Sequence, residues 1–260
     1  MHHDAILSNL FRTEHRKITA VLVRFFGFEH IEIAEDIVSE TFLSATENWK
    51  TKGIPDNPAA WLYTVAKNKA KDRLKRDAIF NQKVQPALQN ERGLTQEAEI
   101  DLSEKNINDS QLQMMFAICQ PAIPSEAQIG LALRILCGFS IDEIADAFLT
   151  NKETINKRLF RAKEKLRTLK IKIQFPAGAE IDKRLETVLI TLYLLFNEGY
   201  YSNSGNINLR KDLCLEAMRL NYLLIENPQT DVPAVNALFS LMCFHTSRFD
   251  ARMDQHGEII

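Results

Sequence analysis

Apolar residues recur every three or four positions along most of the chain, which is the spacing of amphipathic α-helices. The pattern predicts helices over residues 4–26 and 31–49, and a third helix over residues 57–80, where Asn57 is suited to be the N-cap and Pro58 to the first turn. Gly and Pro are few, and no run of alternating β-branched residues is long enough for a strand. We therefore expect an all-α protein.

The periodicity fails over residues 86–110, which are polar and acidic and have no sustained apolar stripe. This composition is typical of a flexible linker between domains. Helical spacing resumes near Gln111, and after a Pro-bounded turn it predicts one helix over residues 125–137. A last group of helices is predicted at 181–196, 210–224 and 233–249, with a loop that begins at Asn197 after the first of them.

The pattern between residues 139 and 167 predicts two helices that are separated by a turn of about three residues. Ser140 and Glu143 have the spacing of a capping box, and Asn151 is suited to cap the second helix. The inner face of the second helix is expected to hold Ile155, Leu159, Ala162 and Leu166. A short helix, a turn and a longer helix together indicate a helix-turn-helix motif.

Positive and negative charges are separated into different segments of the chain, and this separation indicates what each segment binds. The 260 residues carry a net charge of −2, but residues 151–173 hold nine Lys or Arg against two Asp or Glu, and residues 61–85 hold seven against two. Residues 29–49 hold six Asp or Glu and no Lys or Arg. We expect the two basic segments to bind nucleic acid and the acidic helix to bind a basic protein, with solvated charged surfaces as the alternative in each case.

The second helix of a helix-turn-helix lies in the major groove, where its N-terminal residues contact bases and nearby cations hold phosphates. The outward residues are Lys152, Glu153, Asn156 and Lys157, followed by Arg158 and Arg161. In the other basic segment, Lys67, Lys71 and Lys75 recur every four residues and form a stripe for phosphate contact. Trp61 precedes this stripe and is expected in the core, with base stacking as the alternative.

No catalytic or metal-binding pattern is visible. The four cysteines are too far apart in the sequence for a zinc or redox motif, and the six histidines do not stand at ligand spacing. We therefore expect a protein that is not an enzyme and has no metal or cofactor. The longest apolar run, residues 187–196, is about half as long as a membrane helix, and no signal pattern is present, so we expect a cytoplasmic protein without membrane contact.

Three segments together resemble a known family. AEDIVSETFLSA and NPAAWLYTVAKNKAKDRLKR resemble region 2, and RILCGFSIDEIADAFLTNKETINKRLFRAKEKLR resembles region 4, of bacterial extracytoplasmic-function sigma factors in the sigma-70 family. LYLLFNEGYYSNSG resembles a subgroup with a tetratricopeptide-like C-terminal extension. The resemblance implies a region 2 domain at 1–85, the linker at 86–110, a region 4 domain at 111–173 and a helical extension at 174–260. Because that subgroup continues further, we expect the chain to be a fragment.

The resemblance also implies partners. Core RNA polymerase would bind Asp36, Glu40 and Phe42, and an anti-sigma or other regulatory protein stays open as a further partner. Promoter DNA would meet Asn68, Lys71, Asp72 and Arg73 near the upstream hexamer, with a flipped base at residues 51–57, and would meet Glu153, Asn156, Lys157, Arg158 and Arg161 at the minus-thirty-five element.

Two alternatives to a sigma factor stay open. One is a helix-turn-helix regulator that binds DNA unaided, and the other is a helical-repeat scaffold whose basic segments bind an acidic protein. The acidic helix favours the sigma factor, because an unaided regulator does not need such a surface.

Overall fold

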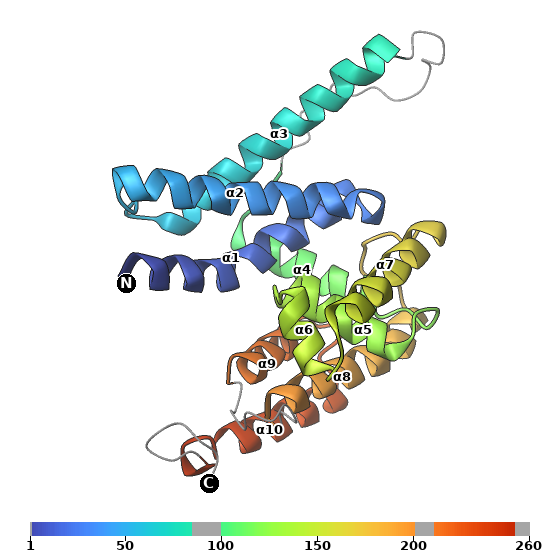
Figure 1. The fold of residues 1–260 in the computed structure, drawn as a ribbon. Coiled ribbons are helices and arrows are strands. Elements are labelled where there is room, and N and C mark those ends of the chain that lie inside the picture. The colour runs from blue at the N-terminus through green and yellow to red at the C-terminus, as the bar shows by residue number, and fades with distance from the viewer. Residues whose placement is uncertain (1, 85–99, 201–210, 253–260) are drawn as a thin grey trace. The chain divides into compact units, whose positions relative to one another are not determined.

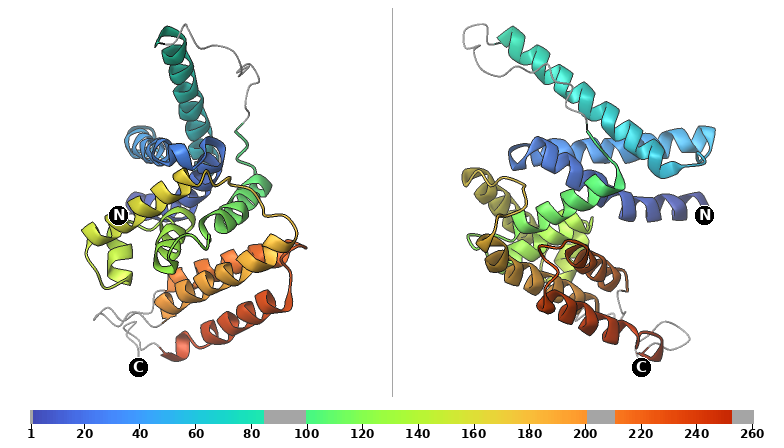
Figure 2. Two further views of the ribbon diagram at one scale, coloured as in Figure 1. Left: turned by 90° about the vertical axis from the view of Figure 1, so that its right-hand side faces the viewer. Right: turned by 180° about the vertical axis from the view of Figure 1, so that it is seen from behind.

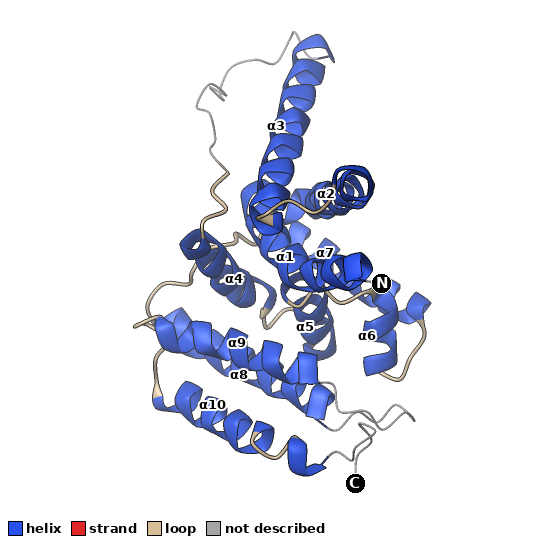
Figure 3. Cartoon of the chain, turned by 90° about the vertical axis from the view of Figure 1, so that its left-hand side faces the viewer, coloured by secondary structure: helices blue, strands red, loops and turns tan. Residues whose placement is uncertain are grey.

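The computed structural model describes residues 2–84, 100–200 and 211–252, and within these ranges the chain forms helices and connecting turns without strands (Figures 1 and 3). The prediction of an all-α protein is confirmed for this part of the chain. Two compact units are present, Met1–Ile107 and Asn108–Ile260.

The first unit is built from three long helices. α1 (His2–Phe26) is followed by a 3-10 helix (Phe28–His30), α2 (Ile31–Lys52) and α3 (Pro58–Val84). All three pack on one another, and the C-terminal part of α3 projects beyond the other two (Figures 1 and 2). Gly27 and Gly53 lie in the left-handed region, with φ of 81° and 83°, and mark the ends of α1 and α2 at low steric cost.

α4 (Glu104–Ile118) begins inside the predicted linker, which corrects the expectation that helix resumes near Gln111. Asp101 accepts hydrogen bonds from the backbone and hydroxyl of Ser103, and the Ser103 hydroxyl accepts one from the Asn106 N–H at 3.4 Å, so the first turn is capped locally. Ile107 is a single buried apolar residue in this turn, and Glu104, Lys105 and Asp109 around it are exposed, so the sequence shows no apolar stripe there. Residues 85–99 of the predicted linker lie outside the described residues.

The helix-turn-helix belongs to the second unit. α6 (Ile141–Ala147) and α7 (Lys152–Thr168) form it, α5 (Ser125–Leu131) precedes it, and α5 and α6 both pack on α7. The single α-helix predicted over 125–137 is wrong in its second half, where Ala132–Leu136 form a π-helix closed by a 3.1 Å bond from the Cys137 N–H to the Ala132 carbonyl. The wider turn buries Leu133, Ile135 and Leu136 together.

α8 (Ala179–Tyr200), α9 (Lys211–Glu226) and α10 (Pro233–Thr246) complete this unit, and a 3-10 helix (Asp250–Arg252) follows. α9 packs against both of its neighbours (Figure 2). The loop predicted to begin at Asn197 starts later, because residues 197–200 still belong to α8, and residues 201–210 lie outside the described ones.

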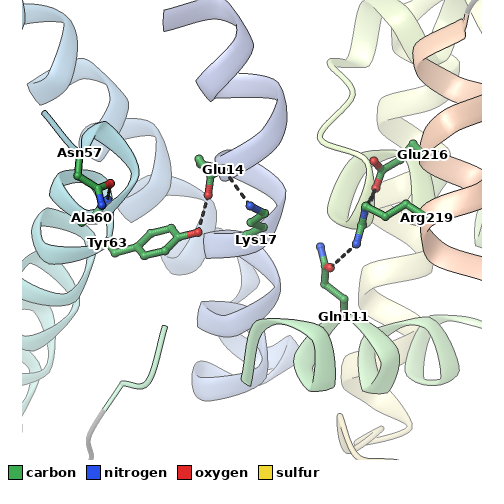
Figure 4. Close-up of polar contacts among 8 residues, drawn as sticks. All are labelled: Glu14, Lys17, Asn57, Ala60, Tyr63, Gln111, Glu216 and Arg219. Atoms are coloured by element: carbon green, nitrogen blue, oxygen red, sulfur yellow. Dashed lines mark hydrogen bonds and ion pairs between the residues drawn. The ribbon is translucent and has the colours of Figure 1, made fainter. Parts of the chain in front are cut away.

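The extension is packed on the helices that precede the helix-turn-helix. α8 contacts α5, the Phe116 and Phe175 rings lie 5.0 Å apart, and the Cys119 thiol lies 3.8 Å from the Thr191 hydroxyl. Arg219 of α9 donates a 2.8 Å hydrogen bond to the side-chain carbonyl of Gln111 in α4 (Figure 4). Region 111–260 is therefore held together by apolar and polar contacts in one compact unit.

Candidate nucleic-acid interface

Two side-chain caps fix where the helices of the motif begin. The Ser140 hydroxyl accepts a 3.2 Å bond from the Glu143 N–H, and the Glu143 carboxylate accepts a 2.8 Å bond from the Ser140 N–H. Asn151 accepts a 2.8 Å bond from the Thr154 N–H at the start of α7. Both predicted caps are confirmed, and together they set the register of the outward side chains of α7.

The inner face of α7 fixes the angle of the helix. Its four predicted apolar residues are all buried, namely Ile155, Leu159, Ala162 and Leu166. Gly130 of α5 lies opposite Leu159, and a Cβ atom there would be only 3.1 Å from the Leu159 methyl group. α5 and α7 are thus close at this point, and a side chain larger than glycine would crowd Leu159.

The N-terminal outer face of α7 is exposed as predicted. Lys152, Glu153, Asn156 and Lys157 are all solvent-facing. Glu153 pairs with Lys157 at 2.7 Å, and Lys152 pairs with Asp142 of α6 at 2.5 Å. Such exposed ion pairs contribute little to stability, so a phosphate or base edge can replace them at small cost.

Arg158 and Arg161, which the sequence groups together, lie in different environments. Arg158 is turned inward: its side chain is 25% exposed, pairs with Glu126 of α5 at 2.8 Å and lies 5.2 Å from the centre of the Phe148 ring. Arg161 is exposed and, with Lys157, Arg158 and Lys165, lines a hollow of about 580 Å³ between α7 and residues 122–127. Arg161 can therefore reach an anion, whereas Arg158 ties α7 to its neighbours.

The lysine stripe on α3 is also divided. Asn68, Lys71 and Lys75 are exposed, whereas Lys67 and Arg73 are half-buried. Lys67 lies near Asp101, whose pKa is lowered first by its backbone hydrogen bond with Ser103, then by the Ser103 hydroxyl and more weakly by the Lys67 charge. The outer half of the stripe is thus the part that is open to a phosphate backbone.

The aromatic residues before the stripe pack within the unit. Trp61 is half-buried and meets the buried Trp49 edge to face at 5.4 Å, so it packs against the core without lying fully inside it. The Tyr63 hydroxyl donates a 2.5 Å hydrogen bond to Glu14, a buried carboxylate that also pairs with Lys17 (Figure 4). Burial raises the pKa of Tyr63, and the Glu14 carboxylate raises it further, so the phenol stays protonated.

The acidic surface lies on α2. Asp36 and Glu40 are exposed, and Glu40 forms a 3.2 Å ion pair with Lys69 of α3. Phe42 is 4% exposed, with its ring 4.9 Å from that of Phe11, so it lies in the core and not on this surface. Its neighbour Leu43 is 59% exposed and shares the face of Asp36 and Glu40. The resemblance assigns Phe42 to this surface, although its spacing from the buried Val38 and Ala45 places it on the inner face of α2.

Among residues 2–84, 100–200 and 211–252, no helix has the length and apolarity that crossing a bilayer requires. In the same ranges no three His, Cys, Asp or Glu side chains gather in a way that could hold a metal ion.

Comparisons with known proteins match three segments of the chain. Residues 10–78 match Sigma-70 region 2, residues 123–166 match Sigma-70, region 4, and residues 184–260 match a family of unknown function (DUF6596). An uncharacterized protein of Rhizobium meliloti (strain 1021) is 34% identical over 245 residues, which are 92% of this chain and 56% of that protein. The chain thus spans little more than half the length of this relative. No solved structure matches the chain.

Proposed function

We propose that this chain, whose residues 10–78 match Sigma-70 region 2 and whose residues 123–166 match Sigma-70, region 4, is a sigma factor of the extracytoplasmic-function type. Such a protein binds core RNA polymerase and directs promoter recognition and transcription initiation. The observation that carries the proposal is the separation of charge between helices. Residues 29–49 hold acids and no Lys or Arg, whereas α7 and the outer half of α3 expose cations. One surface suits a basic protein, and the other two suit phosphates.

We propose a cytoplasmic protein that acts by binding DNA and polymerase, without a chemical step. α7 enters the major groove of the minus-thirty-five element, with Lys152, Glu153, Asn156 and Lys157 at base edges. Phosphates are held by Arg161 and, at the upstream hexamer, by Lys71 and Lys75. Phosphate contacts supply affinity and base contacts supply sequence preference.

The acidic face of α2 docks on the polymerase through Asp36, Glu40 and the exposed Leu43. Charge complementarity at such a face mainly increases the rate of association and excludes wrong partners. An apolar side chain among the carboxylates adds contact area that is insensitive to salt, because its burial does not depend on charge.

The extension acts, in this proposal, through region 4. α8 contacts α5, which packs on α7. Phe175 and Arg219 of the extension contact Phe116 and Gln111 of α4 in the same unit. An anti-sigma or other regulatory protein that binds the extension would therefore change how region 4 is presented.

Gel filtration of the chain with purified core polymerase tests the proposal. We expect co-elution, followed by transcripts from specific positions when the complex is given a genomic fragment library. The matched control is Asp36→Lys with Glu40→Lys, two exposed changes that leave the core of region 2 intact. Specific DNA binding by the chain alone, without co-elution with polymerase, would instead identify an unaided regulator.

A further inference from the structure

α7 exposes one aromatic residue on its outer side. Phe160 is 63% exposed, whereas every other apolar residue of α7 lies on the buried inner face. Scattered apolar residues are common on protein surfaces, but this ring stands among charged residues on the face that we assign to DNA. Its position therefore bears on which bases the helix prefers.

Phe160 shares its face with the residues placed at base edges. Glu153, Asn156, Lys157 and Phe160 follow one another at i, i+3, i+4 and i+7, which puts them side by side on one side of the helix. Phe160 is eight residues after the first residue of α7, about 12 Å along the axis. The major groove admits a helix whose N-terminal turns face base edges, and a ring on the same face two turns later faces the same groove.

Rows of cations flank this face on both sides. Lys152 and Lys163 follow one edge of it, and Arg161 and Lys165 follow the other. When cations on both sides of a groove hold phosphates, the residues between them point at the floor of the groove. Phe160 lies between the two rows and is thereby directed at base edges.

Only one group on the floor of the major groove is apolar. The edges of guanine, cytosine and adenine present hydrogen-bonding groups, whereas thymine adds a 5-methyl group. A phenyl ring placed against a polar edge would remove water from that edge without a replacement hydrogen bond. We propose that Phe160 contacts a thymine 5-methyl group, so that the element bound by α7 contains thymine at one fixed position; this inference rests on the proposed function.

The test removes the methyl group alone. Duplexes would be selected from randomised DNA with the holoenzyme formed from the full chain and core polymerase, and each dT of a selected site would then be replaced by dU, which keeps every hydrogen bond. At one position we expect binding to weaken about fourfold, the value of burying one methyl-sized group. With Phe160→Ala the same replacement should have no effect, because the ring is already absent.

Controls separate this contact from other roles of the ring. Phe160→Ala alters an exposed side chain and should leave the thermal midpoint unchanged, and Leu169→Ala, at the exposed C-cap of α7, should keep the native fourfold response to dU. Full tolerance of dU at every thymine, or equal weakening in the native protein and Phe160→Ala, would overturn the thymine contact. A loss of polymerase binding by Phe160→Ala without any dU effect would assign the ring to a protein contact and overturn it as well.

The outcome also distinguishes this inference from the proposed function. A holoenzyme that selects sites without dependence on the methyl group keeps the sigma-factor function and loses only the thymine contact. Failure to form a holoenzyme, or to select any sequence, overturns both.

Discussion

Arg158→Ala and Arg161→Ala should have opposite consequences although the two residues are three positions apart on one helix. Arg158 contacts Glu126 at 2.8 Å and lies over the Phe148 ring at 5.2 Å, whereas Arg161 is exposed beside the hollow next to α7. We expect the first substitution to weaken the fold and the second to weaken DNA binding.

The size of each effect follows from these contacts. The partly exposed Arg158–Glu126 pair contributes at most about 1 kcal/mol, and the cation–π contact with Phe148 contributes about 0.5–1 kcal/mol. Arg158→Ala should therefore cost about 1–2 kcal/mol. A unit of roughly 150 residues loses about 2–4 °C of thermal midpoint per kcal/mol, so the expected shift is about 2–8 °C. Arg161→Ala should stay within about 0.5 kcal/mol of the native protein.

For DNA binding we expect the larger effect from Arg161→Ala and the smaller effect from Arg158→Ala. Each phosphate contact contributes about 0.9 to the slope of log K against log salt concentration, so Arg161→Ala should reduce that slope by about 0.9 and Arg158→Ala should leave it unchanged. Fluorescence anisotropy of the holoenzyme on a promoter duplex at several salt concentrations measures the slope, and thermal melting of the chain measures stability. If Arg158→Ala lowered the slope and left the midpoint unchanged, the assignment of Arg158 to helix packing would be wrong.

Three further changes probe other parts of the molecule. Ser140→Ala removes the cap of α6 and should cost about 1 kcal/mol in urea denaturation, with Ser125→Ala, where no side-chain cap bond is made, as its control. Asp36→Lys with Glu40→Lys should weaken the affinity for core polymerase at least about tenfold in gel filtration, because like charges would then face each other; unchanged co-elution would contradict the acidic docking surface. Burial raises the pKa of the Cys119 thiol to about 12 from 9.0. Above pH 9 the folded state therefore keeps a proton that the unfolded state releases. The free energy of unfolding should fall as pH rises above 9, by up to about 1.4 kcal/mol per pH unit. Urea titrations of Cys119→Ala across that range should show a shallower decline.

The parts of the fold that sequence patterns predict well are those decided by neighbours in the chain. Ser140 with Glu143, Asn151 with Thr154, and Asn57 with the Ala60 N–H at 3.0 Å are caps made across three residues. Their partners are visible in the sequence itself, so the helix starts and the face of α7 that turns outward follow directly. The inner apolar set of α7 follows for the same reason, because its spacing is the period of the helix.

The remaining features depend on partners that are distant in the sequence. Nothing beside Arg158 indicates that Glu126 will draw it inward. Phe42 follows the buried period of α2, and its ring lies near Phe11 and His15. The adjacent Leu43 turns instead to the acidic side of the helix. The start of α4 could not be predicted either, because its first turns are polar and Ile107 is the apolar residue there that packs in the core.

The packing of the extension on α4 and α5 determines at which residue a chimera with a related protein can be joined. A graft that transfers the helix-turn-helix and ends at residue 174 would expose to water the surfaces of α4 and Cys119 that Phe175, Thr191 and Arg219 cover. A junction ahead of Asp101 keeps α4 and its cap intact and carries residues 108–260 together as one compact unit. Chimeras that keep residues 108–260 together should therefore keep the fold of this unit and, with it, the DNA preference that we propose for α7.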